Sequence, residues 1–319
     1  MLSQIAEQLK KAKSVGIFTH TRPDGDAYGS AIALSLALSA LSIPNYICVD
    51  GAPPSNLTFM ARTAETVEKP PFEAEVFVAV DAAEGTRLGD CADFFFAGKN
   101  RKKLTCNIDH HISNTRFAEM NFVKECAANS LHIMRLISYM GVPLTKEMAE
   151  YLLLGVLTDS GNFSHDDVDE DCFLAAATLV KAGADISSLT YELFKKQSKE
   201  RLALLSSVTA KTRYYFDGRF AAIVISQAEL EKANADLGQT EGLVDYPLSV
   251  DTVEVAAALL EVKRGKYKIS LRSKRYADVN GIASAYGGGG HVRAAGCMLF
   301  GEVEEVLDRL SYTVSQYLE

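Results

Sequence analysis

Four short apolar runs in the first half of the chain constrain its fold more than any other feature. They cover residues 14–19, 45–49, 76–80 and 104–108, and a helical stretch at residues 27–41 separates the first two. Continuous apolar runs of this length are typical of strands buried on both faces of a parallel sheet. The first half is therefore predicted to be an α/β domain whose parallel sheet carries helices on both faces.

Potential ligand side chains follow three of these runs, at the points where the strands end. His20 follows the first run, Asp81 follows the third, and Asp109-His110-His111 follows the fourth. Ligands of parallel α/β sheets bind beyond the carboxyl ends of the strands. These side chains are therefore expected to gather at one edge of the sheet, and it is this clustering, more than the tripeptide itself, that indicates a site.

Further carboxylates stand at two other positions. Asp24 and Asp26 lie in a Pro/Gly turn shortly after His20, where either could simply cap the following helix. Asp159 follows a predicted helix at residues 146–157, and a carboxylate at a helix C-terminus is unfavourable unless a cation compensates it. Carboxylate and imidazole groups without thiolates suit manganese, magnesium, iron or cobalt better than a structural zinc. So many candidate ligands indicate two metal ions.

The second half of the chain has a different pattern. Helices are predicted at residues 130–139 and 170–182, and a polar helical stretch at residues 187–209 is interpreted as a connector. Beyond it, two hairpin patterns, a glycine run and a last helix predict a smaller α+β domain with a mixed sheet; these features cover residues 213–225, 253–272, 287–290 and 303–317. The predicted domains are thus 1–186 and 210–319, on either side of the connector.

Composition excludes several classes of protein. A chain of 319 residues suggests two domains, and a net charge of -8 argues against a protein that coats long nucleic acid. There is no apolar stretch of roughly 18 residues, as a membrane span requires, and no signal peptide pattern, so a cytoplasmic location without membrane contact is expected. The cysteines are scattered and are expected to be buried, reduced thiols; they are Cys48, Cys91, Cys106, Cys126, Cys172 and Cys297.

The combined motifs resemble those of a known enzyme family. The segments around His20, Asp81, Asp109-His110-His111 and Asp159 are similar to the four motifs of the DHH phosphoesterase superfamily. Residues 272–296 resemble the DHHA1 domain that follows in one of its branches, and the matching stretches are Arg272-Ser273, Val279-Asn280 and Gly288-Gly289-Gly290-His291-Val292-Arg293-Ala294-Ala295-Gly296. Length and domain pair look like the nano-RNase/pAp phosphatase branch.

The resemblance implies a role for each residue of the first domain. Two divalent ions, Mn²⁺ ahead of Mg²⁺ or Co²⁺, would be bound with Asp81 bridging them. Asp109 would orient a histidine, and His111 would bind the scissile phosphate or protonate the leaving oxygen. The implied metal ligands are His20, Asp24, Asp26, Asp81, His110 and Asp159. The family often has a Ser/Thr-rich stretch where residues 126–132 stand here, and this difference affects expectations about the surroundings of the ligands.

Substrate recognition is expected mainly in the second domain. Arg272 and His291 resemble residues that hold the far phosphate or base of the substrate, and Arg293 is a further candidate. A guanidinium fork suits a phosphate, and a glycine run such as Gly289-Gly290 lets backbone N–H groups approach an anion, although a flexible loop is the alternative. In the first domain Asn114 could hydrogen-bond a phosphate. His132 and His165 are interpreted as structural or surface residues.

The predicted activity is the hydrolysis of very short oligoribonucleotides to mononucleotides and the dephosphorylation of adenosine 3′,5′-bisphosphate (pAp). Alternatives are a linear dinucleotide phosphodiesterase of cyclic-dinucleotide signalling, an exopolyphosphatase or pyrophosphatase, and a metal-containing nucleotide-binding protein without turnover. The expected partners are short single-stranded RNA or nucleotides and not long nucleic acid. The sequence leaves open whether the chain forms a homodimer.

Overall fold

The computed structural model describes residues 1–51, 57–60, 66–100 and 103–318. The chain divides into two compact units, a first unit of Met1–Lys196 and a second unit of Gln197–Glu319. The division falls inside the segment predicted as a connector: helix α7 (Ile186–Thr190) and the π-helix η3 (Tyr191–Lys195) belong to the first unit, whereas α8 (Lys199–Thr209) belongs to the second.

The first unit is built on a parallel sheet with the strand order β3-β2-β1-β4-β5-β6. All four predicted strands are present. The strands are β1 (Val15–Phe18), β2 (Asn45–Cys48), β3 (Thr66–Val67), β4 (Val76–Val80), β5 (Leu104–Asp109) and β6 (Met120–Val123). The short edge strands β3 and β6 were not predicted, because neither is a fully buried apolar run of the kind that identified the others.

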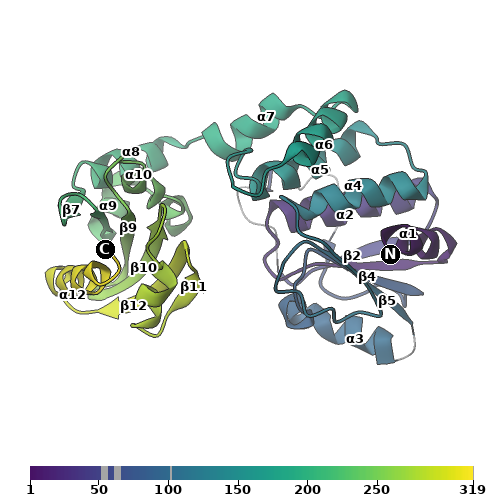
Figure 1. Ribbon diagram of the computed structural model, residues 1–319, viewed down its shortest axis with the longest axis horizontal. Helices are drawn as coiled ribbons and strands as arrows, with labels where there is room; N and C mark the ends of the chain where they lie inside the picture. The colour runs from purple at the N-terminus through teal and green to yellow at the C-terminus, as the bar shows by residue number, and fades with distance from the viewer. Residues whose placement is uncertain (52–56, 61–65, 101–102, 319) are drawn as a thin grey trace. The chain divides into compact units, whose positions relative to one another are not determined.

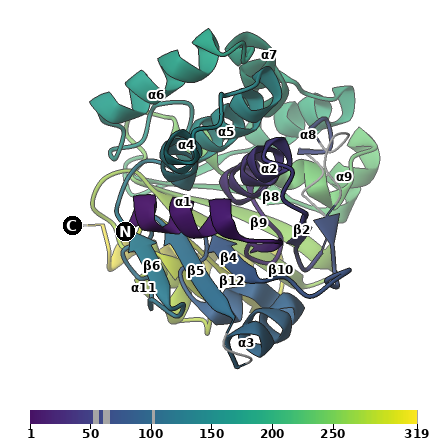
Figure 2. The same ribbon diagram turned by 90° about the vertical axis from the view of Figure 1, so that its right-hand side faces the viewer.

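Helices cover both faces of this sheet, as predicted (Figure 2). Alternate residues of each strand serve opposite faces, so that Ile17 packs in the larger core and Phe18 in the smaller one. The larger core lies under α1 (Leu2–Lys11), α2 (Gly25–Ala40), α4 (Asn129–Met140), α5 (Lys146–Asp159) and α6 (Glu170–Lys181). The smaller core lies under the 3₁₀ helix η2 (Gly85–Cys91) and α3 (Ala92–Asn100).

The strand order places a topological switch point between β1 and β4. The chain leaves β1 towards β2 on one side and returns to β4 on the other side. Crevices of this kind, outside the carboxyl ends of the two strands, are where open parallel sheets bind ligands. His20 and Asp81 follow these two neighbouring strands, so the topology brings them to one place.

The second unit contains a mixed sheet with the order β11-β12-β10-β9-β8-β7. Neighbours are antiparallel except for β8 and β9, which are parallel and are joined through helices. Both predicted hairpins are present. The strands are β7 (Arg213–Tyr215), β8 (Phe220–Ile225), β9 (Val255–Lys263), β10 (Lys266–Ser273), β11 (Gly289–His291) and β12 (Ala294–Phe300). The predicted mixed α+β architecture is thus confirmed.

Helices pack on both faces of the mixed sheet, but one face is only partly covered (Figure 1). One face packs against α11 (Val279–Ser284) and α12 (Val303–Ser315). The other face packs against α8, α9 (Gln227–Ala233) and the segment that holds the 3₁₀ helix η4 (Leu237–Thr240) and α10 (Asp245–Leu248). The strand residues of this second core come from β8 and β9 only, and no apolar residue of β10, β11 or β12 belongs to it.

All six cysteines lie in the described part of the chain and are free thiols, buried except for the half-buried Cys126. Among the described residues, no single helix is long and apolar enough to cross a bilayer. The helical stretches Glu170–Lys181 and Ile186–Lys195 meet the length and composition criteria only as a pair bent by 118°.

Candidate metal centre

Three overlapping triads of carboxylate and imidazole groups lie at the switch point of the parallel sheet. In each triad the potential ligand atoms lie within 4.8 Å of one another. Asp81 belongs to two triads and His110 to two. The triads are His20, Asp24 and Asp81; Asp26, His110 and Asp159; and Asp81, His110 and His111. The structure thus brings together all six residues that the resemblance implied as metal ligands.

The first triad is assembled by the turn that links β1 to α2. Asp24 is the N-cap of α2, and its Oδ1 accepts hydrogen bonds from the backbone N–H groups of Asp26 and Ala27 at 3.1 and 3.0 Å. Its Oδ2 lies 3.7 Å from Nε2 of His20, and that nitrogen is 3.9 Å from Oδ2 of Asp81. The capping role considered from the sequence is thus filled by Oδ1, which leaves Oδ2 facing His20 and available as a potential ligand atom.

The second triad joins side chains from α2, β5 and α5. Nε2 of His110 lies 3.3 Å from Oδ1 of Asp81 and 3.3 Å from Oδ2 of Asp159, the last residue of α5. Asp26 is fully buried in the first turn of α2. No Lys or Arg forms an ion pair with these carboxylates within the described ranges, and the cluster has the ligand types that a divalent cation binds.

Two of the histidines are oriented in the same way. Nδ1 of His20 donates to the carbonyl of Thr21 at 3.0 Å, and Nδ1 of His110 donates to the carbonyl of Cys126 at 2.8 Å. In neutral imidazole a proton on Nδ1 leaves the lone pair on Nε2. In both residues Nε2 faces the carboxylates, which is the arrangement that metal-binding histidines adopt.

Asp81 is held in a strained conformation between the triads. Its φ angle is 54°, a left-handed value that few non-glycine residues adopt, and its side chain is 2% exposed. Its Oδ1 is buried and accepts no hydrogen bond from the described residues. Buried carboxylate oxygens nearly always have a partner, so this atom fits a metal ligand.

The electrostatics of the cluster also favour a cation. Burial, together with the neighbouring carboxylates Asp26 and Asp81, raises the pKa of Asp159 to about 10, and burial with Asp81 nearby raises the pKa of Asp26 to about 7. Burial lowers the pKa of His110, but the surrounding carboxylates outweigh it and raise that pKa to about 11. Without a bound cation the cluster therefore retains protons, which a divalent ion would displace.

Asp109 supports His111 and is itself supported by Asn114. Its Oδ1 accepts a hydrogen bond from Nδ1 of His111 at 2.8 Å, and its Oδ2 accepts one from Nδ2 of Asn114 at 2.6 Å. Burial of the Asp109 carboxyl favours its neutral form, but these two hydrogen bonds prevail and hold its pKa below the ordinary value. Nδ2 of Asn114 also faces the carbonyl of Ala82 and Oδ1 of Asn107, so its amide positions the tripeptide, a role that the sequence did not predict.

The residues that hold Asp26 were missed by sequence reasoning. The first N–H groups of α4, those of Asn129 and Ser130, donate to its two carboxylate oxygens, and the Ser130 hydroxyl adds a hydrogen bond of 2.5 Å. Asn129 and Ser130 lie within residues 126–132, the stretch that differs from the usual family pattern. The cap-forming Asn-Ser pair was the available signal, because such residues begin helices and N-terminal N–H groups attract a carboxylate.

Two of the residues predicted to bind substrate in the second unit lie on the same face of its sheet. Arg272 on β10 and His291 on β11 are each in register with Ala294 of β12. Directly paired residues point to the same face, and two strand spacings separate them by roughly 10 Å. Arg272 is half-buried and His291 is exposed.

The glycine run and Arg293 make internal contacts. The flexible-loop alternative, which covers Gly287 to Gly290, is wrong for Gly289 and Gly290, which lie in strand β11, whereas Gly287 and Gly288 precede the strand. Gly290 has a φ of 153°, and its N–H donates to Oδ1 of Asn280 at 2.9 Å. The guanidinium of Arg293 donates to the carbonyl of Ala277 at 2.9 Å, so both groups stabilise this edge of the sheet.

Comparisons with known proteins give the same division of the chain. Residues 14–156 match the family model "DHH family, N-terminal domain", and residues 217–319 match the "DHHA1 domain". A curated relative is the bifunctional oligoribonuclease and PAP phosphatase NrnA of Thermus thermophilus. It is 33% identical over an alignment that covers 98% of this chain and 93% of the relative.

Solved structures show the same fold. An exopolyphosphatase-related protein from Bacteroides fragilis has a TM-score of 0.89 at 26% identity, covering 99% of this chain and 96% of that one. RecJ of Thermus thermophilus in complex with Mn²⁺ has a TM-score of 0.54 at 14% identity, covering 99% of this chain and 54% of RecJ. The two family models, the relative that spans nearly the whole chain and the His/Asp cluster lead to one conclusion: this chain is a member of the DHH phosphoesterase family with a C-terminal DHHA1 domain.

Proposed function

We propose that the protein is a two-metal phosphoesterase that hydrolyses very short oligoribonucleotides to mononucleotides and dephosphorylates pAp. The observation that carries the proposal is the position of Asp81, which lies in a triad with His20 and Asp24 and also beside His110 of the second triad. A shared carboxylate suits two ions a few ångströms apart. We propose Mn²⁺ as the ion, ahead of Mg²⁺ or Co²⁺, since the ligand set has only oxygen and imidazole donors.

The ligand sets of the proposal follow the triads. His20 and Asp24 would hold one ion, Asp26, His110 and Asp159 would hold the other, and Asp81 would serve both. Ions bound there would polarise a phosphoryl oxygen and lower the pKa of a bound water. The hydrogen bonds from Asn129 and Ser130 fix the Asp26 carboxylate before an ion binds, which reduces the entropy lost on binding.

His111 is the residue that we propose to act on the phosphate. Its Nδ1–H is held by the charged Asp109 carboxylate, and its side chain is 34% exposed, more than that of His110. The hydrogen bond to Asp109 fixes the orientation of the His111 ring, which would bind the phosphate or donate a proton to the leaving oxygen. Asp109 is a positioning residue in this scheme.

The substrate class follows from the relatives and from the charge. The Thermus relative is named for oligoribonuclease and PAP phosphatase activity, and a net charge of -8 does not favour long RNA. In the second unit Arg272 and His291 provide cationic and polar groups on one sheet surface, and we propose them as substrate-binding residues. Gly290 and Arg293 stabilise the adjoining edge of the sheet, and Asn114 positions the tripeptide. Gly289 lies in the same strand as His291. A cytoplasmic location and a homodimer stay predictions.

A hydrolysis panel with added manganese tests the function. It compares RNA of two to five nucleotides, pAp, linear dinucleotides of cyclic-dinucleotide signalling, pyrophosphate and polyphosphate. Turnover of short RNA and pAp is expected. Turnover of pyrophosphate or polyphosphate alone would reject the proposal, and tight metal binding without hydrolysis of any phosphoester would favour a binding protein.

Replacing Asp81 tests the two-metal arrangement. The Asp81→Ala variant should lose at least about 1,000-fold in kcat, because both ions lose a ligand and the developing charge is no longer stabilised. Circular dichroism should show an unchanged fold, and metal analysis should show fewer than two bound ions. Wild-type rates in this variant would contradict the proposal. Asp90→Ala, an exposed aspartate outside the triads, is the matched control.

A further inference from the structure

Three arginines stand at the carboxyl edge of the parallel sheet, where the metal triads also lie. Arg22 follows β1, Arg87 lies in η2 after β4, and Arg116 follows β5. Strands β1, β4 and β5 are neighbours in the sheet, and neighbouring strands are about 4.8 Å apart. The loops that carry these arginines are therefore adjacent, and we call the three residues the arginine rim.

Backbone hydrogen bonds join the loops of the arginine rim to one another beside the metal ligands. The N–H of Thr21, the residue after His20, donates to the carbonyl of Arg87 at 2.8 Å. The N–H of Thr115 donates at 2.8 Å to the carbonyl of Ala83, which lies in the loop between β4 and η2. Main-chain contacts thus fix the rim next to the candidate metal centre.

Two residues of the rim have a strained backbone. Arg22 has a φ of 52° and Arg116 a φ of 53°, left-handed values that few non-glycine residues adopt. The N–H of Arg116 donates at 2.7 Å to Oδ1 of Asn114, the residue whose amide also holds Asp109. The N–H of Arg22 donates to the carbonyl of Asp50 at 3.3 Å. Residues held in such conformations concentrate at ligand-binding sites.

The guanidinium groups of the rim have no partner in the part of the chain that the structure describes. Arg22, Arg87 and Arg116 are all exposed, and none makes an ion pair or a side-chain hydrogen bond with a described residue. Because the chain has a net charge of -8, this row of cations is not part of a generally basic surface. Guanidinium groups form charge-assisted, often bidentate hydrogen bonds with phosphate, so the rim suits the phosphates of a ligand.

Ile112 adds an exposed apolar side chain beside the rim. It follows His111 directly and is 81% exposed. The N–H of Asn114 donates to the carbonyl of His111 at 3.2 Å, so Ile112 lies in a tight turn. Turns favour glycine and short polar residues, and Ile112 belongs to no apolar core of the described residues. An exposed apolar side chain here suits contact with a nucleobase.

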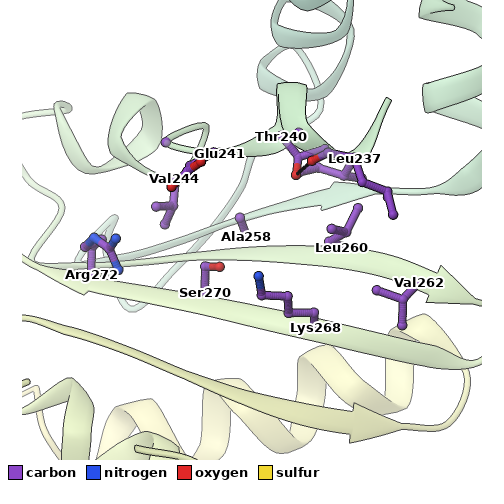
Figure 3. A pocket seen from close by; sticks show the side chains of 13 residues that line it. Leu237, Thr240, Glu241, Val244, Ala258, Leu260, Val262, Lys268, Ser270 and Arg272 are labelled. Atoms are coloured by element: carbon purple, nitrogen blue, oxygen red, sulfur yellow. Dashed lines mark hydrogen bonds between the residues drawn. The ribbon is translucent and has the colours of Figure 1, made fainter. Parts of the chain in front are cut away.

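The two proposed substrates differ by one nucleoside. The scissile phosphate of RNA links two nucleosides, whereas the 3′-phosphate of pAp is attached to one. The proposed function assigns substrate binding in the second unit to Arg272, which lines a pocket of about 400 Å³ (Figure 3). This volume is near the lower end of the range for small-molecule sites and offers space for one nucleotide. The nucleoside that pAp lacks therefore needs contacts elsewhere.

We propose that the arginine rim and Ile112 bind the nucleotide of an RNA substrate that pAp lacks. The guanidinium groups bind phosphates beyond the scissile one, and Ile112 contacts the base. These are specificity-determining residues that favour RNA over pAp and take no part in the chemical step. The inference rests on the proposed function for its two substrates.

Arg87→Gln and Arg116→Gln in the full-length protein test the rim, with Arg264→Gln as the matched control. Arg264 is an exposed arginine between β9 and β10 that does not line the pocket. Each rim variant should lower the ratio of kcat/KM for trinucleotide RNA to kcat/KM for pAp about tenfold, because a charge-assisted hydrogen bond to phosphate is lost. The loss should lie in the KM for RNA, Arg116→Lys should lose less, and Arg264→Gln should keep the wild-type ratio.

Metal analysis of each variant accompanies the kinetics. A rim variant that loses bound metal together with RNA hydrolysis would assign its arginine to the metal centre and overturn the inference. Wild-type ratios in both rim variants also overturn it, as does a wild type that hydrolyses pAp but not RNA. If the wild type hydrolyses RNA alone, kcat/KM for RNA relative to Arg264→Gln replaces the ratio.

Failure of the proposed function gives a different result. A wild type that hydrolyses neither substrate rejects that function, and calorimetric titration with the uncleaved trinucleotide then tests the rim. Weaker binding in Arg87→Gln and Arg116→Gln than in Arg264→Gln supports the inference, and equal binding in all three variants overturns it.

Discussion

At the scale of single residues, the best-defined feature is the support of buried Asp26. Two N–H groups and a hydroxyl from the start of α4 hold this carboxylate. We predict that Ser130→Ala weakens divalent-metal affinity about tenfold, because partners that orient metal ligands typically contribute 10- to 100-fold.

The measurement for Ser130→Ala is a metal titration followed by calorimetry. The control is Ser138→Ala, which removes an exposed hydroxyl from the same helix. Equal metal affinity in Ser130→Ala and the wild type would show that the hydroxyl contact has no part in ligand positioning.

At the scale of elements, helix α4 carries a pH-sensitive contact. His132 is fully buried, its Nε2 donates to the carbonyl of Lys124 at 2.6 Å, and burial lowers its pKa from 6.5 to about 4. Below pH 6.5 the unfolded chain takes up a proton that the folded chain does not, so stability falls as pH falls towards about 4. Acidification from pH 7 to pH 5 should therefore lower the free energy of unfolding by about 2 kcal/mol through His132.

Urea unfolding at pH 7 and pH 5 measures this effect. We predict that His132→Gln, whose amide can still donate to the carbonyl of Lys124, loses less stability than the wild type on acidification, by about 2 kcal/mol. The comparison with the wild type removes the contribution of the carboxylate cluster, which is present in both proteins. Parallel pH dependences would contradict the assignment.

At the scale of the whole molecule, the triads all lie in the first of two units. A ligand that binds only the folded state stabilises that state, by about 2.7 kcal/mol when the free ligand concentration is 100 times the dissociation constant. We predict that Mn²⁺ slows amide hydrogen exchange in β1, β4 and α5 of the first unit and leaves β9 and β10 of the second unit unchanged. The Asp81→Asn variant should lose this protection. Equal slowing of amide exchange in both units would contradict the prediction that Mn²⁺ binds in the first unit.

The sequence predicted the strands whose apolar composition directly reflects their burial. The apolar runs of β1, β4 and β5 are buried on both faces, so composition alone identified them. The half-polar strand β6 at the sheet edge has no such signal. Similarly, the glycine run at residues 287–290 indicated backbone freedom but did not reveal that its second half belongs to strand β11, since pairing with β12 depends on other residues.

The residue types of the candidate metal centre were determined by the sequence, because a strand end followed by His or Asp places that side chain at the edge of a parallel sheet wherever the strand lies. His20, Asp81 and His110 were predictable in this way. Only the tertiary structure decided that Asp81 belongs to two triads and that Ser130 reaches Asp26 from 104 residues away. These contacts depend on strand order and register, which arise from packing between segments far apart in the chain and which local residue patterns do not specify.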